Sequence, residues 1–259
     1  MKRILCFGDS NTWGHNPVDC SRLERPWPKV LKELLPDCVI IEDGVCGRTT
    51  VFDDPTASGK NGITAFREII RNNERADLAV IMLGTNDTLN FYDCDAKGSA
   101  EAVRMFVKEW KSAFKDSDVL VISPIEIKEN ALIHPIFKEL YNSSSIEKSK
   151  EFAKYYAEMA AEEGVYFMDA AKIAEASDID GIHMEPAEHE KLAAAVSEKV
   201  KESGNVVDGT VPDFIVLVHE LCHADRAMRG ASLSRKKERY YYQTGVIERP
   251  YPRRKNKIW

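Results

Sequence analysis

Short apolar runs alternate with longer amphipathic stretches from residue 3 to about residue 202. Five of the runs predict β-strands, at residues 3–7, 38–41, 78–83, 119–122 and 165–168. Several are apolar at nearly every position, which is typical of parallel strands covered on both faces. Apolar residues at helical spacing predict helices at residues 28–35, 63–73, 100–115, 145–163 and 186–202. The alternation predicts an α/β protein, a three-layer α/β/α sandwich around a five-stranded parallel sheet.

The pattern changes after the last of these helices. Residues 203–209 (SGNVVDG) are mostly polar and contain two glycines, which favours a linker. We therefore predict a domain at residues 1–202 and a short C-terminal extension at residues 203–259. Charge divides in the same way, because the extension holds 11 Lys and Arg against 6 Asp and Glu, and the net charge of −6 leaves −11 for residues 1–202. Within the extension, residues 211–230 predict a helix.

Composition limits the class of protein. With 259 residues, 44% of them hydrophobic and 30% charged, the chain is typical of a soluble globular protein. No apolar stretch approaches the ~20 residues of a spanning helix, so we expect no membrane partner. The apolar run at the N-terminus is too short for a secretory signal, which predicts a cytoplasmic location. Six scattered cysteines without a CxxC pair favour thiols over a disulfide framework.

Polar residues with chemical potential follow three of the predicted strands. Ser10, in GDSN (residues 8–11), comes directly after the first strand and is a candidate nucleophile. Asn86, in GTND (84–87), follows the third and could donate N–H to a developing oxyanion. Gly47, in GVCGRTT (44–50), follows the second and would let the backbone approach a ligand. Each cluster taken alone could equally be turn or capping chemistry.

A fourth cluster, DGIH, occupies residues 180–183 shortly before the last predicted helix. Asp180 can fold back onto one imidazole nitrogen of His183 while the other nitrogen faces a serine hydroxyl, which is what a general base requires. The pair could also be a surface contact or a helix cap. Together the four clusters are more specific, because ligands of open α/β sheets bind at the carboxyl ends of the strands.

GDSN, GVCGRTT, GTND and DGIH, in this order, resemble the four sequence blocks of the SGNH hydrolases, also called GDSL esterases and lipases. The resemblance covers about 200 residues. The stretches RILCFGDSNTWGHNP, IEDGVCGRTTVFDDP and VIMLGTND are most similar to the arylesterase and acyltransferase branch of that family. The resemblance implies a flavodoxin-like fold and a serine esterase that hydrolyses, or transfers the acyl group of, small carboxylic esters through an acyl-serine intermediate.

The family motifs also imply roles for individual residues. Ser10 would be the nucleophile, His183 the general base and then acid, and Asp180 the residue that orients His183. The oxyanion would be held by the backbone N–H groups of Ser10 and Gly47 and by the side chain of Asn86.

Four neighbouring residues receive secondary roles. Asp9 and Asp87 would brace the loops, while Trp13 and Arg48 would line the substrate pocket, although an indole near a turn is as often packing. The reaction implies no cofactor, and GxGxxG and GxxxxGK[ST] are missing from the sequence. Short acyl esters, aryl esters and acetylated sugars remain open as substrates, and relatives of this kind can form homo-oligomers.

The extension contains HELCH (residues 219–223), an HExxH pattern. His219 and His223 would share one helical face and could bind Zn²⁺, with Glu220 beside them as a base. The surrounding segment resembles the active-site helix of zincin metallopeptidases, which gives a zinc-dependent activity or metal binding as the alternative function. The other interpretation is an amphipathic helix packed on the first domain.

The end of the chain is basic. From Arg229 onward it holds ten Lys and Arg against two acidic residues, which would attract phosphate. A solvated tail, or docking on the acidic body of the same chain, is the more common use of such a run. We therefore expect a small-molecule ester partner and no nucleic acid.

Overall fold

Five parallel strands form the central sheet of the computed structural model, which describes residues 1–54 and 57–205. The strands are β1 (Lys2–Gly8), β2 (Cys38–Gly44), β3 (Leu78–Met82), β4 (Asp118–Ser123) and β5 (Tyr166–Asp169). Their order in the sheet is β2-β1-β3-β4-β5, and every pairing is parallel. The prediction of a five-stranded parallel sheet is confirmed.

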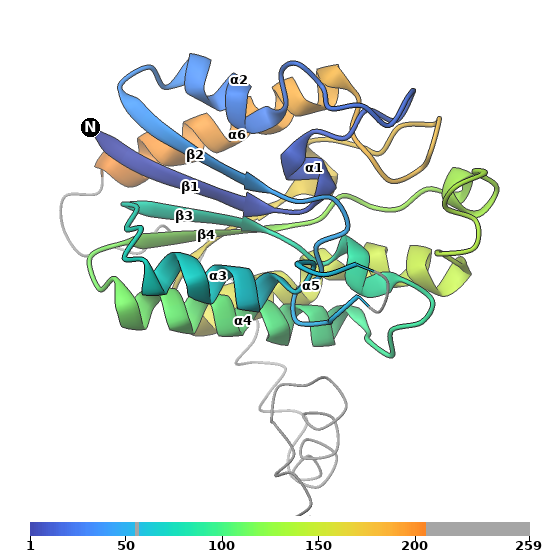
Figure 1. Ribbon diagram of the computed structural model, residues 1–259. Coiled ribbons are helices and arrows are strands. Elements are labelled where there is room, and N and C mark those ends of the chain that lie inside the picture. Colours follow the sequence, from blue (N-terminus) through green and yellow to red (C-terminus); the bar gives the residue numbers. More distant parts are fainter. Residues whose placement is uncertain (55–56, 206–259) are drawn as a thin grey trace, which may run out of the picture.

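Helices cover both faces of the sheet (Figure 1). One face carries α2 (Trp27–Leu34) and α6 (Pro186–Asn205), and the opposite face carries α3 (Gly62–Arg71), α4 (Ala96–Ala113) and α5 (Ser143–Glu163). The pattern did not predict the short elements, which are α1 (Ser10–Trp13), η1 (Thr85–Thr88), η2 (Glu129–Leu132) and η3 (Ala170–Lys172). They have three or four residues each, too few for a helical period to be visible.

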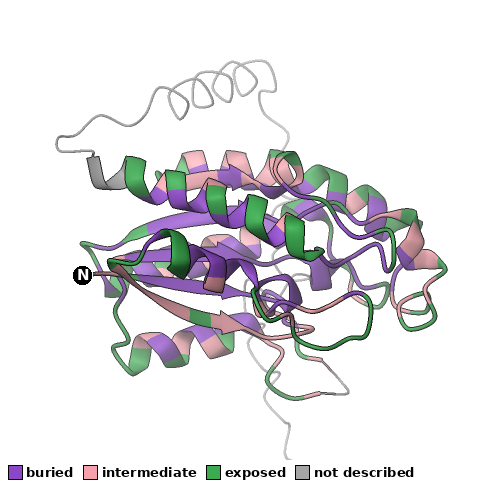
Figure 2. Cartoon of the chain, turned by 90° about the horizontal axis from the view of Figure 1, so that it is seen from above, coloured by how far each residue is buried: buried purple, intermediate pink, exposed green. Residues whose placement is uncertain are grey.

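Alternation along each strand divides the core in two. On β3, Ala79 and Ile81 pack into the cluster shared with α3, α4 and α5, whereas Leu78 and Val80 pack into the cluster shared with α2 and α6. Successive side chains of a strand point to opposite faces, so a strand buried on both sides must be apolar throughout. Figure 2 shows the resulting distribution, with buried residues along the strands and exposed residues on the outward faces of the helices.

Side-chain caps set several helix ends. Asp95 accepts a hydrogen bond from the backbone N–H of Gly98, so α4 begins at Ala96, four residues before its predicted start. Asn142 and Ser145 form a capping box at the start of α5. No helix of the described residues combines the length and apolar character needed to cross a bilayer.

The predicted linker overlaps the last helix. α6 continues to Asn205, three residues into the segment 203–209, so the helix is longer than its apolar periodicity indicated. The rest of that segment, the helix predicted at residues 211–230 and the basic end lie outside the described residues.

Candidate active site

The carboxyl ends of the parallel strands bring the polar clusters to one edge of the sheet. α1 starts two residues after β1 ends, and Figure 1 shows it at the tips of the strands. Residues 44–50 continue from the end of β2, and η1 begins three residues after the end of β3. The loop 180–183 reaches the same place just before α6.

Ser10, His183 and Asp180 form one hydrogen-bonded chain. The Oγ atom of Ser10 lies 2.9 Å from Nε2 of His183, and Nδ1 of His183 lies 2.6 Å from Oδ2 of Asp180. The residues are buried, with exposed fractions of 5%, 4% and 0% for Ser10, His183 and Asp180. Ser10 and His183 are 173 positions apart in the chain, so the tertiary fold alone creates this contact.

The loop that carries His183 is held by hydrogen bonds from its backbone to the side chain of Asp180. Oδ1 of Asp180 accepts hydrogen bonds from the backbone N–H groups of Ile182 and His183, both at 2.9 Å. Burial raises the pKa of Asp180, but the hydrogen bonds from His183 and the backbone outweigh it and hold the pKa below its ordinary value. Gly181 has φ +72°, and a Cβ there would lie 2.5 Å from the backbone nitrogen of Ala131. Only glycine fits this turn.

Asn11 connects α1, which carries Ser10, to the loop that carries His183. Its Nδ2 donates to the carbonyl of Ile182 at 3.2 Å, and its Oδ1 accepts from the backbone N–H of Met184 at 3.0 Å. These two contacts lie on either side of His183. Sequence reasoning gave Asn11 no role. The one available signal was an amide side chain, which can both donate and accept, next to the candidate nucleophile.

Three N–H donors at this edge are candidates for an oxyanion hole. Within the part of the chain that the structure describes, the backbone N–H groups of Ser10 and Gly47 have no protein acceptor. Gly47 has φ +77°, a conformation that L side chains rarely adopt. Asn86 donates one N–H of its amide to the carbonyl of Arg48 at 3.0 Å, which ties η1 to the loop after β2. Because a primary amide has two N–H groups, one is left for a ligand.

Asp9 and Asp87 hold loops in place. Oδ1 of Asp9 accepts from the backbone N–H of Asn11 at 3.0 Å and so caps α1. Asp87 accepts from the backbone N–H of Thr50 at 2.8 Å and from its hydroxyl at 2.6 Å. Burial raises the pKa of each carboxyl to about 6, with the hydrogen bonds from Asn11 and Thr50 opposing the rise. These contacts agree with the bracing role expected for both residues.

Arg48 lies at the ends of two neighbouring strands. Its guanidinium donates to the carbonyl of Gly8 at 3.1 Å, to the carbonyl of Asp43 at 2.7 Å and to the carboxylate of Asp43 at 2.7 Å. It lies 4.1 Å from the ring centroid of Phe7 and is 3% exposed. These donors join the ends of β1 and β2, and the prediction that Arg48 lines the substrate pocket stays a prediction. Trp13 is half-buried, with its ring centroid 6.4 Å from that of His15.

A second imidazole lies against that of His183. The ring centroids of His15 and His183 are 4.0 Å apart with an angle of 31° between the planes. Burial, and then the nearby His183, lower the pKa of His15 to about 4. Phe137 lies on the same side, with its ring centroid 5.6 Å from that of His183 and 5.0 Å from that of His134. The sequence analysis found neither His15 nor Phe137 as a neighbour of His183, because both come from loops without periodicity.

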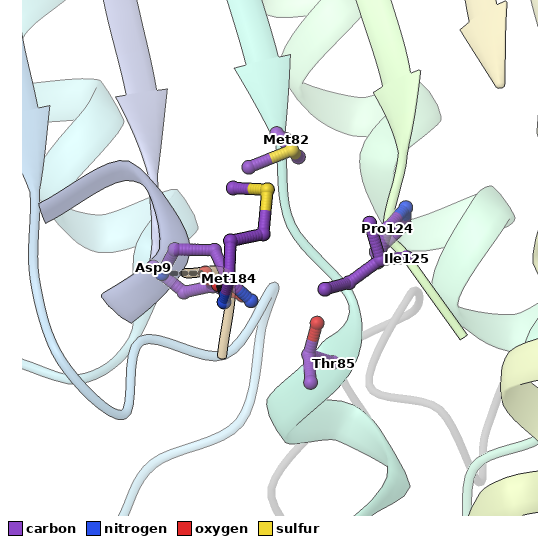
Figure 3. A pocket seen from close by; sticks show the side chains of 7 residues that line it. Asp9, Met82, Thr85, Pro124, Ile125 and Met184 are labelled. Atoms are coloured by element: carbon purple, nitrogen blue, oxygen red, sulfur yellow. Dashed lines mark hydrogen bonds between the residues drawn. The ribbon is translucent and has the colours of Figure 1, made fainter. Parts of the chain in front are cut away.

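A small pocket lies beside these groups (Figure 3). It is lined by Asp9, Asn11, Met82, Thr85, Pro124, Ile125 and Met184. Met184 points its side chain toward Met82 at the end of β3 (Figure 3). Its empty volume, open solvent included, is about 180 Å³. Because neither Ser10 nor His183 lines it, we interpret this pocket as a gap in the packing behind the site.

Possible metal ligands occur in two places. Among the described residues, one group of His, Cys, Asp and Glu has donor atoms close enough to share a metal ion, and it consists of His15, Asp180 and His183. The predicted zinc ligands His219 and His223 lie outside the described residues.

Comparison with known proteins identifies the family. The model of the family described as GDSL-like Lipase/Acylhydrolase matches residues 4–196. The chain belongs to this family. The resemblance of its four motifs to those of SGNH hydrolases is thereby confirmed, and the chain is a carboxylic ester hydrolase by family.

Solved structures of family members agree with this GDSL fold. An inhibitor-bound aryl esterase of M. smegmatis is 32% identical with a TM-score of 0.73, and the match covers 78% of this chain and 99% of that one. Est24, a carbohydrate acetylesterase from Sinorhizobium meliloti, is 30% identical with a TM-score of 0.73 and the same coverage of 78% and 99%. A lipase/acylhydrolase from Enterococcus faecalis, 18% identical with a TM-score of 0.59 over 78% of this chain and 97% of that one, shares the fold. No curated protein sequence matches the chain.

Proposed function

We propose that this chain is a serine esterase that cleaves small carboxylic esters through an acyl-Ser10 intermediate. The observation that carries the proposal is the unbroken chain of contacts from Ser10 Oγ to His183 Nε2 at 2.9 Å and from His183 Nδ1 to Asp180 at 2.6 Å. A hydroxyl, an imidazole and a buried carboxylate in this sequence of contacts are the parts of a nucleophile activated by a general base.

Acylation uses every one of these contacts. Asp180 holds the proton of His183 on Nδ1, which leaves a lone pair on Nε2 facing Ser10. As Oγ of Ser10 attacks the ester carbonyl, Nε2 takes the hydroxyl proton, and the carbonyl oxygen becomes an oxyanion. The N–H groups of Ser10, Gly47 and Asn86 stabilise that charge. His183 then gives its proton to the departing alkoxide, which leaves as an alcohol.

Deacylation repeats the sequence with a second nucleophile. Water gives its proton to Nε2 of His183 as it attacks the acyl carbonyl, and the collapse of the second oxyanion returns the proton to Ser10 Oγ and releases the carboxylic acid. An alcohol in place of the water would accept the acyl group and give a new ester, so the same residues serve acyl transfer. No metal or organic cofactor takes part in either step.

For the substrate we propose a short acyl group, such as acetyl, on an aryl or sugar alcohol. Two observations support this choice. The similar solved structures bear the names aryl esterase and carbohydrate acetylesterase. Phe137 and His15 place an apolar ring and an imidazole ring 5.6 Å and 4.0 Å from the ring of His183, and flat rings suit the stacking of an aryl group or a sugar.

We further propose a cytoplasmic location and a separate C-terminal extension from about residue 203. The five cysteines of the described residues are free thiols: Cys6, Cys20, Cys38, Cys46 and Cys94. Free thiols favour a reducing compartment. The charge difference between residues 1–202 and the remainder supports the division of the chain.

The test is the variant Ser10→Ala, assayed with p-nitrophenyl acetate and with a fluorophosphonate probe. We expect turnover to fall by roughly 10⁶-fold, probe labelling to disappear, and the circular dichroism spectrum to stay unchanged. Ser144→Ala, at an exposed position near the start of α5, is the control and should keep both activities. Unchanged turnover in the folded Ser10→Ala protein would refute the proposal.

A further inference from the structure

The imidazole of the general base has a second imidazole at its side. His15 and His183 lie with ring centroids 4.0 Å apart. One donor atom from each ring and one oxygen of Asp180 all lie within 4.8 Å of one another. The esterase mechanism uses His183 and Asp180 but assigns nothing to the nitrogens of His15.

His15 also carries an unused buried atom. Its Nε2 is buried and, among the described residues, has no hydrogen-bond partner. A buried polar atom without a partner costs about 1–3 kcal/mol. A ligand that binds this nitrogen would remove that cost. An imidazole nitrogen without a hydrogen-bond partner is a good ligand for a transition-metal ion.

The ring of His183 is oriented so that it could bind the same metal ion. Its Nδ1 is bonded to Asp180 at 2.6 Å, and its Nε2 is directed toward Ser10 Oγ at 2.9 Å. An imidazole that gives one N–H to a carboxylate and presents the other nitrogen as a donor is the usual arrangement around protein-bound zinc. The triad thus supplies one oriented ligand, and His15 supplies a neighbour for it.

We propose that His15 and His183 together bind a divalent transition-metal ion, with Zn²⁺ as the preferred example, and that this ion switches the enzyme off. The ion takes one nitrogen from each imidazole, and water or the hydroxyl of Ser10 completes the coordination. Asp180 stays on Nδ1 of His183 as the carboxylate behind the ligand. Imidazole ligands favour Zn²⁺ and Cu²⁺ over Mg²⁺ and Ca²⁺, so the hard cations do not act here.

Metal coordination tightens the pair of rings. Nitrogens around a tetrahedral Zn²⁺ lie roughly 3.3 Å apart, as follows from a Zn–N distance of about 2.0–2.1 Å. The donor atoms of the group lie within 4.8 Å of one another, so the two nitrogens need to approach by at most about 1.5 Å. The side chain of His15 is the one to make that approach, because it is half-buried, whereas the ring of His183 is held by Asp180 and Ser10.

The ion would inhibit the esterase because it binds the catalytic nitrogen of His183. Nε2 of His183 is the atom that takes the proton of Ser10, and a metal ion on its lone pair removes that acceptor. This part of the inference rests on the proposed function, whereas binding of the ion does not. The two are therefore measured separately.

The first experiment measures inhibition of the full chain by Zn²⁺ with p-nitrophenyl acetate, each variant relative to its own activity in EDTA. We expect micromolar Zn²⁺ to inhibit, EDTA to restore activity, and Mg²⁺ to have no effect. His15→Phe keeps a ring beside His183 and should raise the half-inhibitory Zn²⁺ concentration at least about tenfold, since even an outer-shell partner of a ligand is worth 10–100-fold in affinity. His134→Phe, and a His219→Asn/His223→Asn double variant that removes the HELCH imidazoles, are the matched controls and should keep the inhibition.

The second experiment reads binding without catalysis. Ser10→Ala protein that also carries His219→Asn and His223→Asn is titrated with Co²⁺, and we expect visible d–d absorption that His15→Phe abolishes. Inhibition that persists in His15→Phe at the same Zn²⁺ concentration, or no Co²⁺ absorption in the presence of His15, overturns the metal site. An inactive wild-type chain that still shows the His15-dependent Co²⁺ spectrum contradicts the proposed esterase and leaves the metal site standing.

Discussion

Replacing Asn11 tests how the active site is assembled. Its side chain bonds to the carbonyl of Ile182 at 3.2 Å and to the backbone N–H of Met184 at 3.0 Å. All three residues are at most 2% exposed. In Asn11→Leu the volume of the side chain is nearly kept, but a buried carbonyl and a buried N–H on either side of His183 lose their partners.

The size of the effect follows from these two contacts. Each of the two buried groups left without a partner costs about 1–3 kcal/mol, so the free energy of unfolding should fall by about 2–6 kcal/mol. The loop that carries His183 also loses its connection to α1. A misplacement of about 1 Å between reacting groups can lower the rate ~10²-fold. We therefore expect kcat to fall by about that factor with KM little changed, because the contacts of Asn11 position His183 and touch no substrate.

The assay combines urea unfolding with steady-state kinetics on p-nitrophenyl acetate, at a temperature where both proteins are fully folded. Ser117→Ala removes the acceptor of the buried Nε1 of Trp110 just before the start of β4, which costs about 1–3 kcal/mol, and it is the control for a loss of stability at the opposite end of the strands. Asn11→Asp keeps the acceptor for Met184 and should fall between the wild type and Asn11→Leu. Full kcat in a folded Asn11→Leu protein would show that the two hydrogen bonds of Asn11 do not position His183.

Three further predictions concern the oxyanion donors and a buried histidine. Asn86→Ala should lower kcat by ~10²–10³-fold with a smaller change in KM, as removal of one oxyanion donor does elsewhere. Gly47→Ala meets no close neighbour, the nearest atom being 3.7 Å from the new Cβ, but its φ of +77° costs about 1–2 kcal/mol for a non-glycine residue. The peptide should rotate and kcat should fall. His189, fully buried with Nδ1 accepting from the N–H of Trp27 at 3.2 Å, should make the protein less stable in acid.

The sign for His189 follows from its lowered pKa. Burial, and then the charge of His183, lower the pKa of His189 from 6.5 to about 4, so the folded protein keeps the ring neutral while the unfolded chain takes up a proton. Stability is unaffected above pH 6.5 and is lost as the pH falls from 6.5 toward 4, by about 3 kcal/mol in all. His189→Asn retains an acceptor and does not titrate. Urea unfolding at pH 7 and pH 4.5 should show a steeper loss in the wild type than in this variant.

Each of the oxyanion predictions has its own check. Gly59 has φ +78° and open space around its Cβ, so Gly59→Ala carries the same backbone strain away from the triad. Equal kcat for the two alanine variants would mean that the N–H of Gly47 does not contact the oxyanion. For Asn86→Ala, a rise in KM at constant kcat would indicate ground-state binding instead of oxyanion stabilisation.

Most of the fold could be predicted because burial on both sides of a parallel sheet leaves a strong pattern. All five strands and five long helices were predicted, with the largest errors at ends where polar residues continue an element. β2 runs to Gly44, three residues past its apolar run, because it is an edge strand whose Glu42 pairs with Arg22. The start of α4 was placed too late because Ala96 and Gly98 carry no amphipathic signal.

The sequence predicted the candidate residues of the site but not the residues that surround them. Ser10 follows a strand end, Asp180 and His183 lie in the loop before α6, and the structure brings the three side chains into one hydrogen-bonded chain. Arg48 was assigned to the substrate pocket because a charged residue in a glycine-bearing loop resembles a ligand contact. Its donors satisfy carbonyls at the ends of two strands, a use that only the paired strands reveal.

By itself, the order of residues determined the layers of the molecule and the choice of candidate reactive groups, since periodicity and motif chemistry are local properties of the chain. The distances between these groups were decided by the tertiary structure. The 2.9 Å between Ser10 and His183, the clamp of Asn11 on both sides of that histidine, and the contact of His15 with its ring exist because parallel strands deliver their loops to one edge. Contacts between residues more than 160 positions apart have no local signature, so folding alone determines which side chains meet.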